Sequence, residues 1–102
     1  MKATRLNGTS IGPQKFRLYI VNRTPKSLLA LANLKRIREK YLGCEADVEV
    51  VDLRQNPHLA KRDQILSIPT LVRIFPKSGK RVIGDLSDTA GFLRAFGLRF
   101  QE

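Results

Sequence analysis

The chain has 102 residues, enough for one domain, and its 42% hydrophobic and 27% charged content is typical of a globular protein and excludes a disordered one. No stretch approaches the roughly 20 consecutive apolar residues that a membrane-spanning helix needs. The formal net charge of +10 indicates attraction to anionic partners, but charge alone does not separate nucleic acid, a membrane surface and an acidic protein face.

The amino-terminal residues are expected to form a flexible polar leader over residues 1–14, followed by one folded domain over residues 15–102. The leader carries Lys2 and Arg5 but no continuous apolar run, so it does not resemble a secretory signal. A cytoplasmic location is therefore the default expectation.

The first strand is predicted over residues 16–21, which are rich in β-branched and aromatic side chains. Thr24 then suits a helix N-cap, and Pro25 suits the first helical position, where its missing N–H costs nothing. The helix is predicted to run to about Leu42, with Gly43 as its stop. Four apolar residues spaced by four, three and four positions mark its apolar face, namely Ala30, Leu34, Ile37 and Tyr41.

A second strand is predicted over residues 47–52, whose first residues alternate between polar and apolar. Because one long helix separates the two strands, they should be parallel. Asn56 and Pro57 repeat the cap-plus-proline signal and predict a short helix to about Ile65, with Leu59 among its buried residues.

The third strand is predicted over residues 71–75, opened by Ile-Pro-Thr at residues 68–70. Residues 76–80 have the composition of a hairpin turn, so residues 81–85 should return antiparallel.

The last predicted element is a helix capped by Ser87, with Asp88 near its positive end. Its apolar face would carry Leu93, Phe96 and Phe100. The fold class is therefore a single α/β domain with the order β-α-β-α-β-β-α.

This order, with Ile-Pro-Thr leading into the third strand, resembles thioredoxin. In that family the bond before this proline is cis and faces the redox loop, so a cis bond before Pro69 is reasonable, although only about 5–6% of X-Pro bonds are cis. The redox loop would fall at residues 22–27, which contain no cysteine. Cys44 is the only cysteine and suits a turn after the first helix. A thiol oxidoreductase is therefore rejected.

A narrower resemblance covers nearly all of residues 16–100. The segments that carry it are Thr24-Pro25, residues 51–53 with Asn56-Pro57, residues 65–71 (Ile-Leu-Ser-Ile-Pro-Thr-Leu) and residues 82–88 (Val-Ile-Gly-Asp-Leu-Ser-Asp). In this order and spacing they resemble the KaiB family of cyanobacterial clock proteins. The Gly-Asp-Leu-Ser-Asp and Ile-Pro-Thr-Leu runs are the most specific.

The resemblance implies two alternative folds, a tetrameric ground state and a thioredoxin-like monomer that binds the KaiC ATPase ring. The two differ mainly from about residue 50 onward, and switching requires packings within a few kcal/mol of each other. Helical periodicity and a cap over residues 87–100 favour the thioredoxin-like form, as does Ala95, where the family more usually has glycine. The ground-state fold stays the alternative, because Phe92, Phe96, Leu98 and Phe100 also alternate as a strand would.

The resemblance also implies where partners bind. Residues 47–53 would form an exposed strand edge and residues 54–61 the segment that faces a KaiC-type ATPase. A KaiA-like protein could add a strand to that edge, although Asp47 and Glu49 would also repel casual pairing, and a histidine kinase is the other candidate partner. The candidate partner-binding residues are Arg23, Asp47, Glu49, Val50, Asp52, Leu53, Arg54, Asn56, Pro57, His58 and Lys61, and the residues expected to be structural are Thr24, Pro25, Pro69, Gly84, Asp85 and Ser87.

No catalytic, cofactor or metal site is predicted, because His58 reads as a solvent-side residue and one His with one Cys does not make a zinc site. The predicted function is a non-enzymatic clock or signalling adaptor, monomeric if thioredoxin-like and tetrameric in the ground-state fold. The alternatives are a KaiB paralogue with a stress or signalling role and a basic nucleic-acid-binding module. The last rests on charge alone, without a reader motif or interleaved exposed aromatics.

Overall fold

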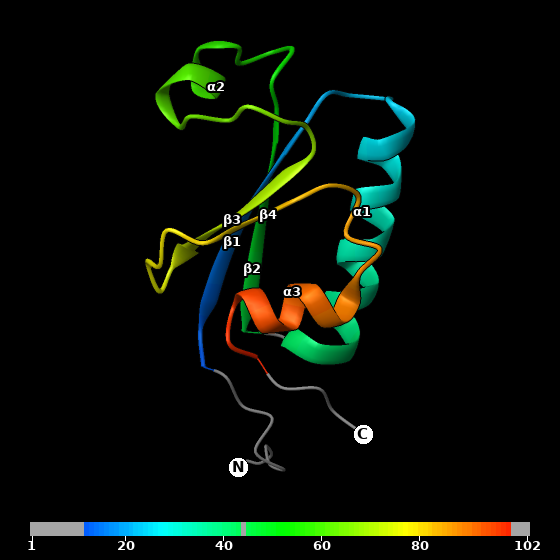
Figure 1. The fold of residues 1–102 in the computed structure, drawn as a ribbon, viewed down its shortest axis with the longest axis vertical. Helices are drawn as coiled ribbons and strands as arrows, with labels where there is room; N and C mark the ends of the chain where they lie inside the picture. The colour runs from blue at the N-terminus through cyan, green and yellow to red at the C-terminus, as the bar shows by residue number, and fades with distance from the viewer. Residues whose placement is uncertain (1–11, 44, 99–102) are drawn as a thin grey trace.

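The computed structural model describes residues 12–43 and 45–98. Its elements are β1 (Gln14–Ile20), α1 (Pro25–Ile37), the π-helical turn η1 (Arg38–Leu42), β2 (Ala46–Asp52), α2 (His58–Arg62), β3 (Thr70–Phe75), β4 (Arg81–Ile83) and α3 (Thr89–Ala95) (Figure 1). The predicted order is therefore confirmed. Most of the expected leader (residues 1–11), Cys44 and Phe100 lie outside the described residues.

The strands form one sheet in the order β2-β1-β3-β4. β1 pairs parallel with β2, as predicted, with Leu18 opposite Val50. β1 and β3 pair antiparallel, with Leu18 opposite Leu71, and β4 returns antiparallel along β3. β2 and β4 are thus the two edges of the sheet. Figure 1 shows α2 beyond the end where β1 and β2 finish, with α3 toward the opposite end.

The main core lies between one face of the sheet and the helices α1 and α3. Alternate residues of β1 face this side, because successive side chains of a strand point to opposite faces. They are Phe16, Leu18 and Ile20, and they pack with Ala30, Leu34 and Ile37 of α1 and with Phe92, Leu93 and Phe96. The predicted stripe on α1 is thus buried, except that Tyr41 is only partly buried.

α3 packs against the sheet through aromatic rings and is hydrogen-bonded to it by one arginine. The ring centroids of Phe92 and Phe96 lie 5.9 and 5.2 Å from that of Phe16, and 5.2 Å from each other. Arg73 of β3 donates to the Phe96 carbonyl at 3.1 Å and lies over the Phe96 ring at 5.4 Å. The end of α3 is therefore held both by burial and by a cation at its carbonyl end.

The start of α1 differs from its prediction in one contact. Pro25 occupies the first helical position, as expected. Thr24 stands at the N-cap, but its hydroxyl donates to the Val21 carbonyl at 2.9 Å and does not cap the first turn. At the other end Gly43 stops the helix with a φ of 79°, as predicted, after a π-helical last turn that the sequence pattern does not distinguish from an α-helix.

The predicted helix from Asn56 and Pro57 to about Ile65 is wrong at both ends. α2 is shorter and follows Pro57 as its N-cap residue. The Asn56 side chain donates instead to the Asp52 carbonyl at 3.4 Å. Gln64 adopts a left-handed φ of 57°, which ends the helix before Ile65. Leu59 is only partly buried, because this short helix lies at the margin of the sheet.

The predicted cap of the last helix is wrong by one residue. Asp88, not Ser87, is the N-cap of α3, and its carboxylate accepts from the Gly91 N–H at 2.9 Å. Ser87 instead donates its N–H to the Asp85 carboxylate at 3.0 Å. A Cβ atom at Gly91 would lie too close to the Asp88 carboxylate as it stands, so a larger residue there would require that side chain to shift.

Asp88→Ala is expected to destabilise the protein by about 1 kcal/mol, since it removes the acceptor for the first turn of α3. Asp88→Asn keeps a side-chain acceptor and should lose only a few tenths of that. Urea unfolding of the two variants checks the prediction. Equal stability of Asp88→Ala and the parent protein would contradict it.

The remaining residues expected to be structural join the strands to α1. The bonds before Pro69 and before Pro76 are both cis. The Pro69 carbonyl accepts the Gly84 N–H at 2.9 Å, and Gly84 has a φ of 113°, a value that favours glycine. Asn33 of α1 donates to the Asp85 carbonyl at 2.8 Å. Hydrogen bonds from Ser87 lower the pKa of Asp85 from its usual value.

Candidate functional site

The second face of the sheet is covered only in part. A smaller apolar cluster lies there, formed by buried side chains from β1, β2 and the segment around α2, namely Tyr19, Val51, Leu53 and Ile65. Arg17 and Tyr19 of β1 point to this face because they alternate with the residues of the main core. The segment from α2 to β3 is thus seated on the sheet opposite α1 and α3.

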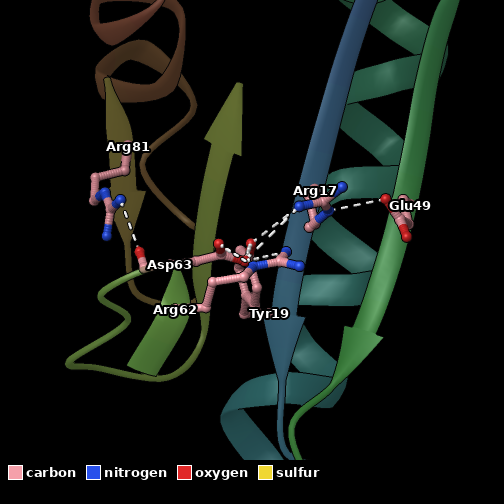
Figure 2. Close-up of polar contacts among 6 residues, drawn as sticks. All are labelled: Arg17, Tyr19, Glu49, Arg62, Asp63 and Arg81. Carbon is pink, nitrogen blue, oxygen red and sulfur yellow. Dashed lines mark hydrogen bonds and ion pairs between the residues drawn. The ribbon is translucent and has the colours of Figure 1, made fainter. Parts of the chain in front are cut away.

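A group of polar side chains, which we call the Tyr19–Asp63 network, ties that segment to the sheet (Figure 2). The Tyr19 hydroxyl donates to the Asp63 carboxylate at 2.5 Å. Arg17 donates to the Tyr19 oxygen at 3.3 Å and to Glu49 of β2 at 2.8 Å. Three chain segments, β1, β2 and the end of α2, therefore meet in one connected set of hydrogen bonds.

Two further arginines complete the network. Arg62 donates twice to the carboxylate of Asp63, at 2.8 and 2.9 Å. Arg81 of β4 donates to the main-chain carbonyls of Gln64 at 2.9 Å and Asp63 at 3.3 Å. The loop after α2 is thereby held to β1 through side chains and to β4 through its backbone.

The ionisation states in the network suit a structural role. The pKa of Asp63 is lowered to about 2, chiefly by the hydrogen bonds from Arg62 and then by that from Tyr19, against the opposing effect of partial burial. Burial is the main cause that raises the pKa of Tyr19. Asp63 is therefore an anion and Tyr19 a neutral donor near neutral pH, and neither has the pKa near 7 that general acid–base catalysis favours.

A pocket of about 310 Å³ opens where β1 and β2 end. We call it the strand-end pocket, and its lining residues are Asn22, Arg23, Asp52, Arg54 and Gln55. The carboxylate of Asp52 accepts the N–H groups of Asn22 at 3.3 Å and Arg54 at 3.0 Å, so it holds both loops in place. Arg23 has a left-handed φ of 69°, which is uncommon for a residue with a side chain.

The structure brings together three of the candidate partner-binding residues in this pocket, Arg23, Asp52 and Arg54. Asn22 and Gln55 also line it; Gln55 lies within the predicted segment 54–61 but is not one of the candidate residues, and Asn22 is absent from the sequence prediction. Their signal in the sequence is their place directly after a strand, because ligand crevices in α/β sheets lie outside the carboxyl ends of parallel strands.

The other candidate residues fall on the edge strand and on α2. Asp47, Glu49 and Val50 are exposed along β2, and Val50 is 46% exposed. Pro57, His58 and Lys61 are exposed at α2, in keeping with a solvent-side His58, and Asn56 is half-buried. Leu53 differs from the rest, because it is 6% exposed and belongs to the apolar cluster under α2.

A second pocket, of about 490 Å³, lies at the end of α2 and the loop that follows it. Ala60, Lys61, Gln64, Ile65 and Leu66 line it, and Leu66 is 93% exposed. Over residues 12–43 and 45–98, the structure contains no helix with the length and apolar character needed to cross a membrane. The same residues hold no group of three His, Cys, Asp or Glu side chains arranged for a metal ion.

Comparison of the sequence with known proteins finds one family. A family model described as the KaiB domain matches residues 17–97. The chain is 38% identical over 86 residues to the circadian clock oscillator protein KaiB of Microcystis aeruginosa, an alignment that covers 84% of this chain and 83% of that protein. It is 41% identical over 87 residues to the protein of the same description from Synechococcus sp. (strain RCC307), with 84% and 78% covered.

Comparison of the structure finds thioredoxins. Fasciola hepatica thioredoxin aligns with a TM-score of 0.67 at 17% identity, over 91% of this chain and 86% of that one. Oxidised mitochondrial thioredoxin 3 from Saccharomyces cerevisiae aligns with a TM-score of 0.65 at 18% identity, over 90% and 85%. Identities this low show the fold alone, and the predicted thioredoxin-like fold is confirmed.

Proposed function

This chain belongs to the KaiB family, and we propose that it is a non-enzymatic adaptor that binds the ring of a KaiC-type ATPase. The observation that carries the proposal is the position of β2. In this thioredoxin-like arrangement β2 is an edge strand, and the exposed side of α2 and the strand-end pocket adjoin its carboxyl end. This position supports a partner-binding surface made of the exposed residues between 47 and 61, which the family resemblance implies, together with Arg23 at the adjoining start of α1.

The non-enzymatic character rests on the chemistry of the sites described above. Residues 22–27, which take the place of the thioredoxin redox loop, contain no cysteine, so a thiolate nucleophile is missing there. Asp63 and Tyr19 have pKa values displaced away from neutrality. These features favour a surface that binds over one that turns over a substrate.

We also propose that the thioredoxin-like arrangement is the state that binds the ring. Ala95 within α3, the Asp88 cap and the burial of Phe92 and Phe96 all stabilise the last helix as a helix. A partner that binds this state more tightly than the tetrameric ground state would draw the population toward it. The same adaptor activity would serve a clock or another signalling pathway.

A second partner is supported by the free edge of β2. An edge strand offers unpaired N–H and C=O groups, so a KaiA-like protein or a histidine kinase could add a strand there. Asp47 and Glu49 are exposed on this edge, and their charges would select a partner strand with basic side chains.

The test is association with a KaiC-type ATPase ring, measured by co-purification and by titration during ATP hydrolysis. The parent chain is expected to bind, and Lys61→Glu on α2 should weaken binding about tenfold by placing like charge against an acidic surface. The matched control is Lys35→Glu, the same reversal at an exposed position in the last turn of α1 and outside residues 47–61, and it should change affinity less than about threefold.

Absence of association in every nucleotide state would overturn the proposal. Tight, salt-sensitive binding of the purified chain to oligonucleotides, in place of the ring, would instead support the nucleic-acid-binding alternative that the net charge of +10 raises.

A further inference from the structure

We infer that the strand-end pocket is an oxyanion site, and that the group it receives is a carboxylate side chain of the partner ring. The inference rests on the proposed function for the identity of the partner. The pocket itself, with Arg23 and Arg54 on its wall, is an observation independent of that function.

The first argument is that two arginine side chains of the pocket, those of Arg23 and Arg54, are unpaired within the described residues. Within the described part of the chain, the guanidinium groups of Arg23 and Arg54 have no hydrogen-bond or ion-pair partner, and both residues are exposed. Arginine presents a planar fork of donors that matches a carboxylate in two parallel hydrogen bonds. Both arginines line the same pocket, and their side chains are available to an incoming acidic group.

The second argument concerns Asp52, the acidic residue of the pocket. Its carboxylate oxygen already accepts two backbone N–H groups, from Asn22 and Arg54. Asp52 thus fixes the pocket wall and offsets only one of the two arginine charges. Asn22 and Gln55 also line the pocket, and both residues carry amide side chains, which are hydrogen-bond donors.

The third argument is the charge at the adjoining start of α1. Its first turn contains no acidic residue and carries Lys26, with Arg23 just before it. Cations at this end oppose the helix dipole and are unfavourable for folding alone. Arg23 also holds a left-handed backbone conformation that disfavours a side chain. An anion bound beside these cations would offset their unfavourable charge at this end of α1.

The size and place of the pocket fit a side chain of a partner. A volume of about 310 Å³ accommodates a carboxylate with its neighbouring atoms, and the opening lies beside residues 54–61, the segment proposed to face the ring. Charge complementarity of this kind steers encounter and fixes register at protein interfaces. The occupant is therefore an Asp or Glu of an acidic loop.

The experiment compares two double variants with equal charge change. Arg23→Gln/Arg54→Gln removes both pocket cations, and Lys35→Gln/Lys77→Gln removes two exposed cations elsewhere. At about 0.1 M salt, we expect the pocket variant to bind the ring at least about tenfold more weakly, with a flatter dependence of affinity on salt, and the control to change less than about threefold. Arg23→Lys/Arg54→Lys should restore affinity only in part, because lysine cannot make the bidentate contact.

Equal affinity of the pocket and control variants would overturn the inference while leaving the proposed function intact. If the parent chain fails to bind the ring at all, the proposed function fails, and the pocket is then judged by NMR titration with sodium citrate at fixed ionic strength. Shifts at the N–H groups of Asn22, Arg23 and Arg54 that vanish in the pocket variant would support an oxyanion site. Absent or unchanged shifts would overturn it.

Discussion

Phe92→Ala is expected to destabilise the protein by about 3–5 kcal/mol, the largest effect among these predictions. The ring is fully buried, and it contacts Phe16 and Phe96 at centroid distances of 5.9 and 5.2 Å. Truncation would leave a cavity between α3 and the sheet, because the rigid strand and helix around it relax only partly. Urea unfolding gives the free energy directly.

The matched control is Phe75→Ala, the same substitution at the end of β3, where the ring is 56% exposed. It should change stability by less than about 0.5 kcal/mol. If Phe92→Ala were no more destabilising than this control, the aromatic cluster would not be what holds α3 to the sheet. The proposal that the thioredoxin-like arrangement is the state that binds the ring would then lose its main support.

Asp63→Asn is expected to lower stability by about 1–2 kcal/mol at pH 7. The change removes the charge that Arg62 and Arg17 pair with, and it replaces one acceptor of the Tyr19 hydroxyl. The pKa of Asp63 is about 2 in the folded protein, against an ordinary 3.8, and this difference taken alone would imply a larger loss of stability. The expected loss is smaller because Arg62 is exposed, so solvent screens its attraction to Asp63.

The pH dependence of stability distinguishes loss of the Asp63 charge from a simple loss of packing. Because the pKa of Asp63 is depressed on folding, its contribution is complete above about pH 4 and is lost as the pH falls through 2. The parent protein should therefore approach the stability of Asp63→Asn in acid. Asp47→Asn, at an exposed position of β2, is the control and should leave the profile unchanged. A constant difference between Asp63→Asn and the parent from pH 7 to pH 2 would contradict the role given to the carboxylate.

The elements of this fold could be predicted from local features of the sequence. Helical spacing of apolar residues, Pro25 at the first helical position and Gly43 at the stop are interactions within one or two turns, so they act whatever the rest of the chain does. Cap assignments were less secure. The sequence predicts Ser87 as the cap of α3, whereas the structure has Asp88. The preceding residue Leu86 is buried and has a left-handed φ of 64°, and this backbone conformation depends on packing that local sequence does not reveal.

The candidate site was predicted in part. The resemblance to a family indicated Asp52 and Arg54, the charge at the start of the first helix indicated Arg23, and the tertiary structure showed that the three share one pocket. The Tyr19–Asp63 network was missed, since its two named residues are 44 positions apart and belong to segments that meet only across the sheet. The polar positions alternating along β1 were the available signal that the sheet has a second, partly covered face.

The sequence by itself determined the element order, the main core face and the family, because caps, periodicity and motifs are short-range properties of the chain. Only the tertiary structure decided which loops close the strand-end pocket and which charges remain unpaired within the described residues. That outcome depends on the parallel register of β1 against β2, which sets Ile20 opposite Asp52 and so brings together the loops that follow the two strands. Such long-range pairings bring together residues whose separation along the chain carries no signal of their contact.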